Sequence, residues 1–398
     1  MLIGFDRERP TRGRRVVVTG LGSVSCAGSE THDLWSALLH NNAPQSRRVP
    51  EFDVSHLGNP KELRRLDPFA LYGLAAADSA WRQSGLPAAY ANGAAVIATG
   101  IGGLQTLTDQ LEVLQTKGAN RVSPFMIPMM MPNAAAAAVS MRFGLTGPCE
   151  TITTACAAGT HAIGYAARLV ATGRVDVAVA GGAEAVMTPI AEAGFANMTA
   201  LSTSGISRPF DLNRDGFVMG EGAGVLILEE YEHAMKRGAV ILAEVSGAAS
   251  TADAHHLTAP DPRAAGAIAC IEAALFDAQL PTEAIDHVNA HGTSTPLNDA
   301  AEGLAIRSVF GSGQLPVTSV KGYTGHALAA AGAIEAVVTV LSLQHQLVPP
   351  TVGTTDIDPQ IDVDVVIGNA RSVELNHVLS NSFGFGGHNG CLVLSRVS

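Results

Sequence analysis

Residues 153–161 are the most informative stretch of the chain. They read Thr153-Thr154-Ala155-Cys156-Ala157-Ala158-Gly159-Thr160-His161. This pattern predicts a strand end that passes directly into a helix of small residues, a corner at which a fold can expose a nucleophile. Because the first N–H groups of a helix and its dipole favour negative charge, we expect the Cys156 thiol to ionise more easily than a free thiol. Cys156 is therefore the candidate nucleophile.

The other four cysteines, Cys26, Cys149, Cys270 and Cys391, lack such a context. Since cysteine is among the residue types most often buried, we expect these four to be inert core residues. A total of five, an odd number without a CxxC pair, argues against both a disulfide framework and a zinc ribbon. A reducing cytoplasm is the compartment that fits best.

Composition indicates a tightly packed globular enzyme, with 398 residues of which 47% are apolar and 15% charged. A length of about 150 residues per domain suggests two to three units. The first ten residues show no secretory signal, and no apolar stretch approaches the roughly 20 residues that span a bilayer. A formal net charge of −11 argues against nonspecific nucleic-acid binding. We therefore expect no membrane and no nucleic-acid partner.

Short β-branched runs alternate with alanine-rich helical stretches, which is an α/β pattern with buried strands. The same order returns after about residue 240. Residues 242–245 correspond to residues 16–19, and residues 287–292 correspond to residues 96–100. Residues 317–321, followed by a helix from about residue 327, correspond to the strand and helix around Cys156. The glycine-dense pieces 216–224 and 384–390 are expected to be tight turns. We predict two similar halves, residues 1–245 and 246–398, the first with the cysteine and the second with two histidines.

His291 and His326 each neighbour a glycine at a predicted strand end, so two similar halves would bring them close to Cys156. Two neutral imidazoles aimed at one point would stabilise an oxygen that gains negative charge, such as that of an enolate. Lys321 either supports this pair or only joins loops by pairing with Glu335 or Asp299.

Three other site types fit poorly. The pattern Gly20-Leu21-Gly22 lacks the third glycine of a dinucleotide fingerprint, because Ser25 stands there. Asp253, His255 and His256 lack a fourth metal ligand at a telling spacing. The chain offers cysteine where a serine hydrolase would carry Gly-x-Ser-x-Gly.

Over nearly its whole length the chain resembles the β-ketoacyl-acyl-carrier-protein synthases, most closely the elongating type II enzymes of the thiolase superfamily. The resemblance is carried by Thr154-Ala155-Cys156, Asn289-Ala290-His291-Gly292-Thr293-Ser294-Thr295, Lys321 with Thr324-Gly325-His326, and Asn381-Ser382-Phe383-Gly384-Phe385-Gly386-Gly387. It implies a thiolase-like α/β fold, in which two duplicated αβαβα halves form a five-layered core. It also implies a homodimer, or a heterodimer with a subunit like a chain-length factor.

By this resemblance, Cys156 takes the acyl chain from the phosphopantetheine of an acyl carrier protein as a thioester. Malonyl carrier protein then loses carbon dioxide, and its enolate attacks the acyl group. His291 and His326 would hold the malonyl thioester oxygen, and the backbone N–H groups of Cys156 and Phe385 would form the oxyanion hole. No metal, redox cofactor or other cofactor is implied beyond the carried substrates.

The resemblance assigns further residues. Lys321 and Glu335 would give polar support to the histidines, and Phe385 would gate the acyl pocket. The implied substrate-binding residues are Ile101 in the acyl channel, Phe383, and Thr293 and Thr295 along the pantetheine arm, and the run Met129, Met130 and Met131 falls where such enzymes form their pocket and dimer contact. Lys61, Arg64 and Arg65 match the carrier-docking surface, to which an acidic carrier would be steered despite the negative charge of the enzyme.

Two departures leave the pathway open. His388 stands where many relatives have threonine, and the loop 202–207, which borders the carrier surface, is shorter than in the fatty-acid enzymes. Fatty-acid elongation and the ketosynthase subunit of a type II polyketide or polyene system, paired with a chain-length partner, both fit. A noncatalytic chain-length or scaffold subunit is disfavoured by the intact Cys156, His291 and His326. A cysteine hydrolase is disfavoured because no triad-like carboxylate or amide follows the histidines.

Overall fold

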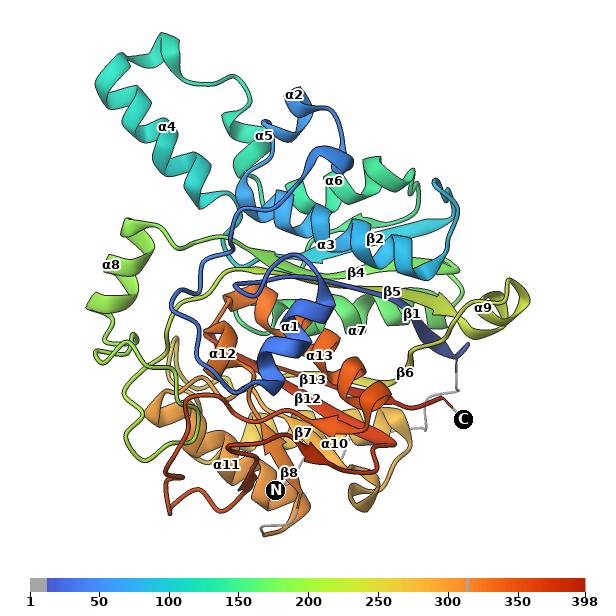
Figure 1. Ribbon diagram of the computed structural model, residues 1–398, viewed down its shortest axis with the longest axis vertical. Helices are drawn as coiled ribbons and strands as arrows, with labels where there is room; N and C mark the ends of the chain where they lie inside the picture. Colours follow the sequence, from blue (N-terminus) through green and yellow to red (C-terminus); the bar gives the residue numbers. More distant parts are fainter. Residues whose placement is uncertain (1–12, 313–314, 398) are drawn as a thin grey trace.

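The computed structural model describes residues 13–312 and 315–397 (Figure 1). The segment in which we looked for a secretory signal lies outside the described residues. Eleven of the described strands are hydrogen-bonded in the order β10-β8-β7-β12-β13-β6-β1-β5-β4-β2-β3. Only two residue pairs, Val17 with Glu244 and Val18 with Ala243, join β1 to β6. The ladder therefore divides at this junction into an N-terminal and a C-terminal sheet.

The N-terminal sheet has the order β3-β2-β4-β5-β1. Its strands are β1 (Val16–Val24), β2 (Gly93–Ala98), β3 (Cys149–Glu150), β4 (Val177–Glu184) and β5 (Gly222–Glu230). Strand β2 runs parallel to β3 and β4, whereas β5 is antiparallel to both β4 and β1. Because β1, β2, β4 and β5 are buried along their whole length, the sheet is covered on both faces.

The C-terminal sheet repeats this pattern in the order β8-β7-β12-β13-β6, with β10 added at its edge. Its strands are β6 (Ala243–Ala252), β7 (His287–Asn289), β8 (Pro316–Thr318), β10 (Asp364–Val365), β12 (His377–Gly384) and β13 (His388–Ser395), and a separate pair is formed by β9 (Leu347–Val348) and β11 (Arg371–Ser372). Strand β7 is parallel to its two neighbours, and β13 is antiparallel to β12 and β6. The three correspondences predicted from the sequence are thus confirmed, β6 with β1, β7 with β2 and β8 with β3, and the structure adds β12 with β4 and β13 with β5. The proposed division at residues 245 and 246 falls inside β6.

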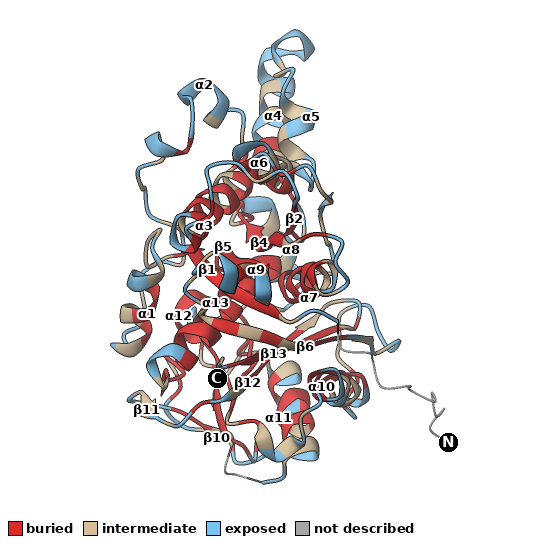
Figure 2. Ribbon diagram, turned by 90° about the vertical axis from the view of Figure 1, so that its right-hand side faces the viewer, coloured by how far each residue is buried: buried red, intermediate tan, exposed pale blue. Residues whose placement is uncertain are grey.

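Helices form three layers around the two sheets (Figures 1 and 2). Helices α3 (Pro68–Ser84) and α6 (Ala134–Phe143) cover the outer face of the N-terminal sheet, and α10 (Ala265–Ala278) and α11 (Pro296–Phe310) lie on the outside of the C-terminal sheet. Between the sheets, α7 (Ala158–Ala171) and α13 (Ala331–His345) contact strands of both and each other. The predicted five-layered core is confirmed. The stretch Leu328–His345 is long and apolar enough to cross a membrane, but 89% of it is buried in this central layer.

Glycines allow the central helices to approach the sheets closely. A Cβ atom on Gly224 would stand 2.4 Å from the carbonyl carbon of Ala333 in α13, and one on Gly159 would stand 2.6 Å from the carbonyl oxygen of Ala329. Gly222 and Gly224 belong to β5, so the expectation of a tight turn throughout 216–224 is wrong for residues 222–224. The glycines there serve helix-on-sheet packing, and the turn prediction holds for 384–390, where residues 385–387 join β12 to β13.

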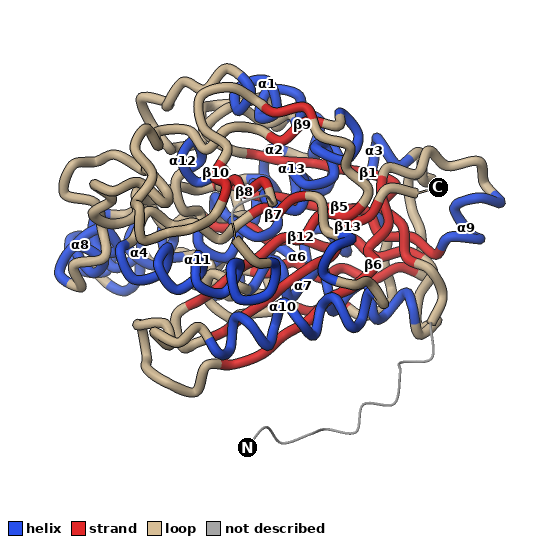
Figure 3. The backbone as a smooth tube through the Cα atoms, turned by 90° about the horizontal axis from the view of Figure 1, so that it is seen from below, coloured by secondary structure: helices blue, strands red, loops and turns tan. Residues whose placement is uncertain are grey.

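The remaining helices do not belong to these three layers, although α12 is itself fully buried. They are α1 (Thr31–Leu39), α2 (Pro60–Leu63), α4 (Leu104–Lys117), α5 (Met126–Met130), α8 (Pro189–Asn197), α9 (Tyr231–Lys236) and α12 (Lys321–Thr324). Helix α4 projects from the N-terminal half (Figure 1), and Thr106 is its one buried residue. Seen from below, α4 and α8 lie towards the same side of the molecule (Figure 3).

The cysteines divide differently from the prediction. Cys270 and Cys391 are buried as expected, but Cys149 is exposed and Cys26 is only half-buried. Cys149 lies in the short strand β3, which pairs with β2 and forms the edge of the sheet among the described residues. Both residues of β3 are exposed, so the expectation of a core residue is wrong for Cys149.

Candidate active site

Cys156 occupies a strained corner immediately before α7. Ala155 has a φ of 49°, a left-handed conformation that is costly for a residue with a Cβ atom. The Thr154 carbonyl accepts the N–H of Ala157 at 3.2 Å, and the Ala155 carbonyl accepts the N–H of Ala158 at 3.1 Å. A corner before α7 is confirmed, but the strand does not pass directly into the helix, because residues 151–157 separate the end of β3 from α7.

Burial reverses the expected electrostatics of the thiol. The Cys156 side chain lies in the interior with 7% of its surface exposed, and burial raises its pKa to about 11. The charge of Lys321 and the backbone N–H of Phe385 oppose this increase only in part. The prediction that Cys156 ionises more easily than a free thiol is therefore wrong, because desolvation of the thiolate outweighs the effect of the helix terminus.

One pocket of about 330 Å³ joins residues from both halves. Of the residues predicted from the sequence, Cys156, His291, Thr293, Thr295, His326, Phe383 and Phe385 line it. The rings of His291 and His326 lie with their centroids 5.3 Å apart at an interplanar angle of 83°, and Phe383 lies 6.0 Å from His291. The sulfur and the two imidazoles thus meet at a single cavity, as predicted. Ile101 does not line this pocket, and its part in an acyl channel stays a prediction.

Carboxylates of α11 hold the loop that carries His291. Glu302 accepts the backbone N–H of His291 at 2.8 Å and that of Gly292 at 2.7 Å. Asp299 accepts the N–H groups of Thr293 at 2.9 Å and Ser294 at 3.1 Å. Both carboxylates are buried. Beyond the end of β7 they accept backbone N–H groups that no longer pair with a neighbouring strand.

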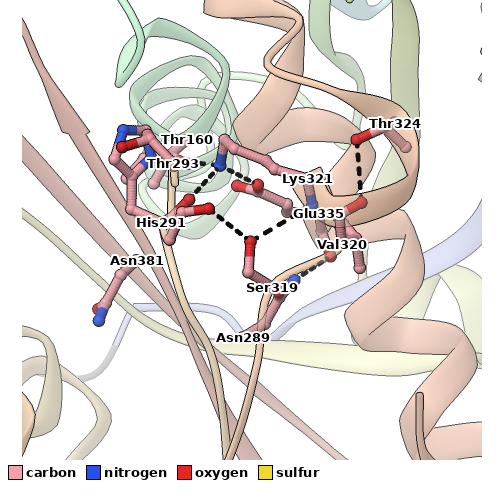
Figure 4. Close-up of polar contacts among 12 residues, drawn as sticks. Thr160, Asn289, His291, Thr293, Ser319, Val320, Lys321, Thr324, Glu335 and Asn381 are labelled. Atoms are coloured by element: carbon pink, nitrogen blue, oxygen red, sulfur yellow. Dashed lines mark hydrogen bonds and ion pairs between the residues drawn. The ribbon is translucent and has the colours of Figure 1, made fainter. Parts of the chain in front are cut away.

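Lys321 does not line the pocket and instead lies beside His291 and Glu335 (Figure 4). Its ammonium forms an ion pair with Glu335, donates to the His291 carbonyl at 2.6 Å, and lies 3.3 Å from His291 Nδ1. Three contacts match the three donors of an ammonium group. Of the two partners considered from the sequence, Lys321 pairs with Glu335, and Asp299 instead faces Arg214 at 4.0 Å.

Both histidines are neutral in this site. Burial lowers the pKa of His291 and of His326 well below the usual value, and the charge of Lys321 lowers both further. Because Lys321 donates to His291 Nδ1, the remaining proton of that imidazole lies on Nε2. The arrangement provides a neutral N–H donor of fixed orientation, which is the form that stabilises a developing oxyanion.

The hairpin between β12 and β13 brings a second backbone donor to Cys156. The N–H groups of Phe385 and of Cys156 itself both donate towards the sulfur and lower its pKa. A Cβ atom on Gly384 would stand 3.0 Å from the backbone nitrogen of Cys156, so glycine permits this approach. These two N–H groups are the pair predicted to form the oxyanion hole, and that role stays a prediction.

The predicted docking residues lie on and just after α2. Lys61 and Arg65 are exposed, and Arg64 is exposed as well, its Nε donating to the Pro60 carbonyl at 3.1 Å. The guanidinium of Arg65 stacks 4.0 Å over the ring of Phe125, which precedes α5. Lys61 and Arg64 therefore present free positive charge, whereas Arg65 also braces α5.

Sequence reasoning missed three residues around the pocket. Glu184 accepts from Gly100 N–H at 2.7 Å and Ala329 N–H at 3.3 Å, and burial raises its pKa to about 7. Burial likewise raises the pKa of Glu302 to about 7. His161 contacts the corner of Cys156 directly. The sequence signal for Glu184 was its place at the end of a glycine-rich strand. Its hydrogen-bond partners could not be predicted, because they are distant in sequence.

Asp253, which was considered with His255 and His256 as a metal site, forms ordinary hydrogen bonds. Asp253 accepts from Asn389 at 2.7 Å and from the Asp261 N–H at 3.2 Å. In the part of the chain that the structure describes, no group of three or more His, Cys, Asp or Glu side chains is arranged to hold a metal.

A duplicated five-layered α/β core with a cysteine and two histidines at the meeting point of its halves defines a thiolase-like condensing-enzyme site. Sequence comparison agrees: residues 49–234 match the family described as "Beta-ketoacyl synthase, N-terminal domain", and residues 242–355 match "Beta-ketoacyl synthase, C-terminal domain". The chain belongs to the β-ketoacyl synthase family.

Relatives of known name extend this result over the full length. The chain is 43% identical to 3-oxoacyl-[acyl-carrier-protein] synthase 2 of Coxiella burnetii, over 96% of this chain and 99% of that protein. It is 44% identical to the synthase 2 of Vibrio harveyi, over 97% and 99% respectively.

Among solved structures, the ishigamide ketosynthase/chain length factor has a TM-score of 0.92 at 32% identity, with 97% of this chain and 100% of that chain covered. A type II polyketide ketosynthase in complex with its acyl-carrier protein has a TM-score of 0.88 at 32% identity and the same coverage.

Proposed function

We propose that the protein is a β-ketoacyl-acyl-carrier-protein synthase of fatty-acid elongation. The observation that carries this proposal is the convergence of Cys156, His291 and His326 on one pocket, with both imidazoles buried and neutral. The higher identity to the synthase 2 enzymes, 43–44% against 32% for the type II polyketide ketosynthase, favours the fatty-acid pathway.

The first step is acyl transfer to the thiol. The Cys156 sulfur attacks the thioester carbonyl of the acyl carrier and forms a new C–S bond. The tetrahedral intermediate then collapses as the C–S bond to pantetheine breaks, and the proton of the Cys156 thiol ends on the departing pantetheine sulfur. The N–H groups of Cys156 and Phe385 stabilise the tetrahedral oxyanion. Because the resting thiol has a pKa of about 11, loss of its proton accompanies attack rather than preceding it.

The second step is decarboxylation of the malonyl thioester. Its C–C bond breaks, carbon dioxide leaves, and the electron pair moves to the thioester oxygen as an enolate held by the N–H groups of His291 and His326. The enolate carbon then attacks the acyl group on Cys156, a new C–C bond forms, and the Cys156 thiolate leaves. Lys321 and Glu335 fix the position and tautomer of His291 during this sequence.

A direct assay tests the proposal. The protein is incubated with acyl and malonyl carrier proteins while carbon dioxide release is measured and the 3-oxoacyl product is identified by mass spectrometry. The expected result is one carbon dioxide for each 3-oxoacyl product. If carbon dioxide or product does not form with any acyl length offered, the activity proposed here is wrong.

A type II polyketide pathway is the second candidate. The 0.92 TM-score to the ishigamide ketosynthase/chain length factor favours it, as does the short loop 202–207. Purification of the chain alone, followed by assay and light scattering, separates the two functions: an active homodimer supports fatty-acid elongation, and dependence on a second subunit supports the polyketide system.

We further propose an acyl carrier protein as partner and a dimeric assembly in the cytoplasm. Exposed Lys61 and Arg64 suit an acidic carrier. The segment of α4 and α5 supports a dimer because it projects from the core with a set of exposed large apolar side chains. This set comprises Leu111, Leu114, Phe125, Ile127 and Met131. The cysteines of the described residues are free, as expected in a reducing compartment.

A further inference from the structure

His161 lies in the first turn of α7 and joins two segments that are far apart in sequence. Its Nδ1 is 2.7 Å from Thr154 Oγ1, and its Nε2 is 3.0 Å from the backbone carbonyl oxygen of Asn389. Both contacts span distances typical of strong hydrogen bonds. The imidazole therefore bridges the corner that precedes Cys156 and the first residues of β13.

The two partners fix the protonation of this ring. A backbone carbonyl can only accept, so Nε2 of His161 carries the proton and donates to Asn389. Burial lowers the pKa of His161, so the ring is neutral, and Nδ1 accepts from the hydroxyl of Thr154. One neutral tautomer satisfies both contacts, which makes the ring a rigid spacer of defined length.

Each end of the spacer supports one of the backbone donors beside the sulfur. Thr154 forms a bridge with Cys156 in the strained corner. Asn389 pairs with Phe383 at the base of the hairpin whose turn carries Phe385. A Cβ atom at position 390 would stand 2.9 Å from the His161 ring, so Gly390 leaves room for the ring against β13.

We propose that His161 is a positioning residue that sets the separation between the N–H groups of Cys156 and Phe385. This inference rests on the proposed function, in which those two groups bind the oxyanion of acyl transfer. His291 and His326 come from the ends of other elements and have no hydrogen bond to His161. Replacement of His161 therefore slows acyl transfer to Cys156 and leaves decarboxylation of malonyl carrier protein nearly unchanged.

The test measures the two half-reactions separately in the full-length enzyme. Acyl-enzyme formation is followed by intact mass spectrometry with acyl carrier protein alone, and carbon dioxide release is followed with malonyl carrier protein alone. For His161→Phe, which removes both contacts, we expect acyl transfer to fall roughly 10- to 100-fold, since a displacement of about 1 Å costs about that much. We expect carbon dioxide release to stay within about threefold of the wild type.

Two further variants separate the contacts. In His161→Asn the amide stands near the position of Nδ1 and keeps the Thr154 contact, whereas in His161→Gln it reaches towards Asn389. Each is expected to transfer acyl groups faster than His161→Phe and more slowly than the wild type. Thr160→Val is the matched control, because it removes another buried hydrogen bond of α7, the 2.7 Å contact with Ser382, and leaves Thr154 and Asn389 untouched.

The outcomes separate this inference from the function on which it rests. Equal slowing of both half-reactions in His161→Phe, or unchanged acyl transfer, overturns the positioning role, and so does an equal loss in Thr160→Val. Thermal denaturation shows whether the variants are folded, and a variant that does not fold is replaced by His161→Gln in the same comparison. A wild-type enzyme that neither acquires an acyl group nor releases carbon dioxide would contradict the proposed function itself.

Discussion

The two halves of the molecule share one strand order and use the same corner differently. In the N-terminal half, residues 151–157 between β3 and α7 form a short, strained corner that carries a neutral thiol. In the C-terminal half, residues 319–330 between β8 and α13 include α12, Lys321 and His326. Duplication therefore supplied two equivalent corners facing one cavity, and each acquired a different part of the chemistry.

A second pair of equivalent segments differs even more. Residues 99–133, between β2 and α6, extend into α4 and α5 and expose apolar side chains. Residues 290–295, between β7 and α11, form a tight loop whose N–H groups are bound by Glu302 and Asp299. The N-terminal half thus exposes an apolar surface, and the C-terminal half fixes the electrostatics of the pocket.

The largest expected effect is the loss of condensation when Cys156 is replaced, which tests whether the two corners carry different steps. Cys156→Ala should reduce condensation by about 10⁴-fold or more, since loss of a catalytic nucleophile typically has this size. Circular dichroism and thermal denaturation should show an intact fold. Cys156→Gln should continue to decarboxylate malonyl carrier protein, because that step belongs to the histidines. Retained condensation by Cys156→Ala, or silence of Cys156→Gln, would break the division between the halves.

The complementary experiment removes the C-terminal donors. His291→Ala or His326→Ala should lower decarboxylation by about 100-fold or more, the usual cost of one oxyanion donor. Acyl transfer to Cys156 should continue, since its donors are backbone groups of Cys156 and Phe385. Intact mass spectrometry and carbon dioxide release measure the two steps. Loss of acylation together with decarboxylation would mean that the corners act as one unit.

Removal of Lys321 should affect stability as well as chemistry. Lys321→Met leaves the buried carboxylate of Glu335 without its partner, which typically costs about 3–5 kcal/mol. Urea denaturation followed by tryptophan fluorescence measures the loss. The matched control, Lys321→Met with Glu335→Leu, should regain most of this stability but not the decarboxylation rate, because His291 Nδ1 has still lost its donor. Equal midpoints for the wild type and Lys321→Met would contradict the role of the ion pair.

The smallest effect is an acid sensitivity confined to the C-terminal sheet. His287 in β7 is buried with neither ring nitrogen hydrogen-bonded, and burial lowers its pKa to about 3 from an ordinary value of 6.5. The unfolded chain binds this proton below pH 6.5 and the folded chain does not, so stability falls as pH decreases from 6.5 towards 3. Between pH 6.5 and 4.5 the loss is on the order of 2 kcal/mol.

His287→Phe should remove that contribution. The difference in free energy of unfolding between the variant and the wild type, measured by urea denaturation at several pH values, should increase in favour of the variant below pH 6.5. A difference that stays constant with pH would show that His287 finds a partner for its proton in the folded protein.

The sequence was a good guide to elements and reactive residue types. Strands β1, β2, β4 and β6 were found from their β-branched runs, and the cysteine and histidine motifs from local patterns of small residues and glycine. The sequence was a poorer guide to the burial and protonation of those residues. Cys149 was expected in the core and lies on an edge strand, and Cys156 was expected to ionise easily but has a raised pKa.

The sequence by itself determined the order of strands and helices, the duplication, and the identity of the thiol and the two imidazoles, because these depend on short-range patterns that a chain carries wherever it folds. Tertiary structure alone decided the protonation of Cys156, the carboxylates Glu184 and Glu302, and the bridge made by His161. The physical reason is that desolvation and hydrogen bonding are set by neighbours that are distant along the chain, 228 residues away in the case of His161 and Asn389.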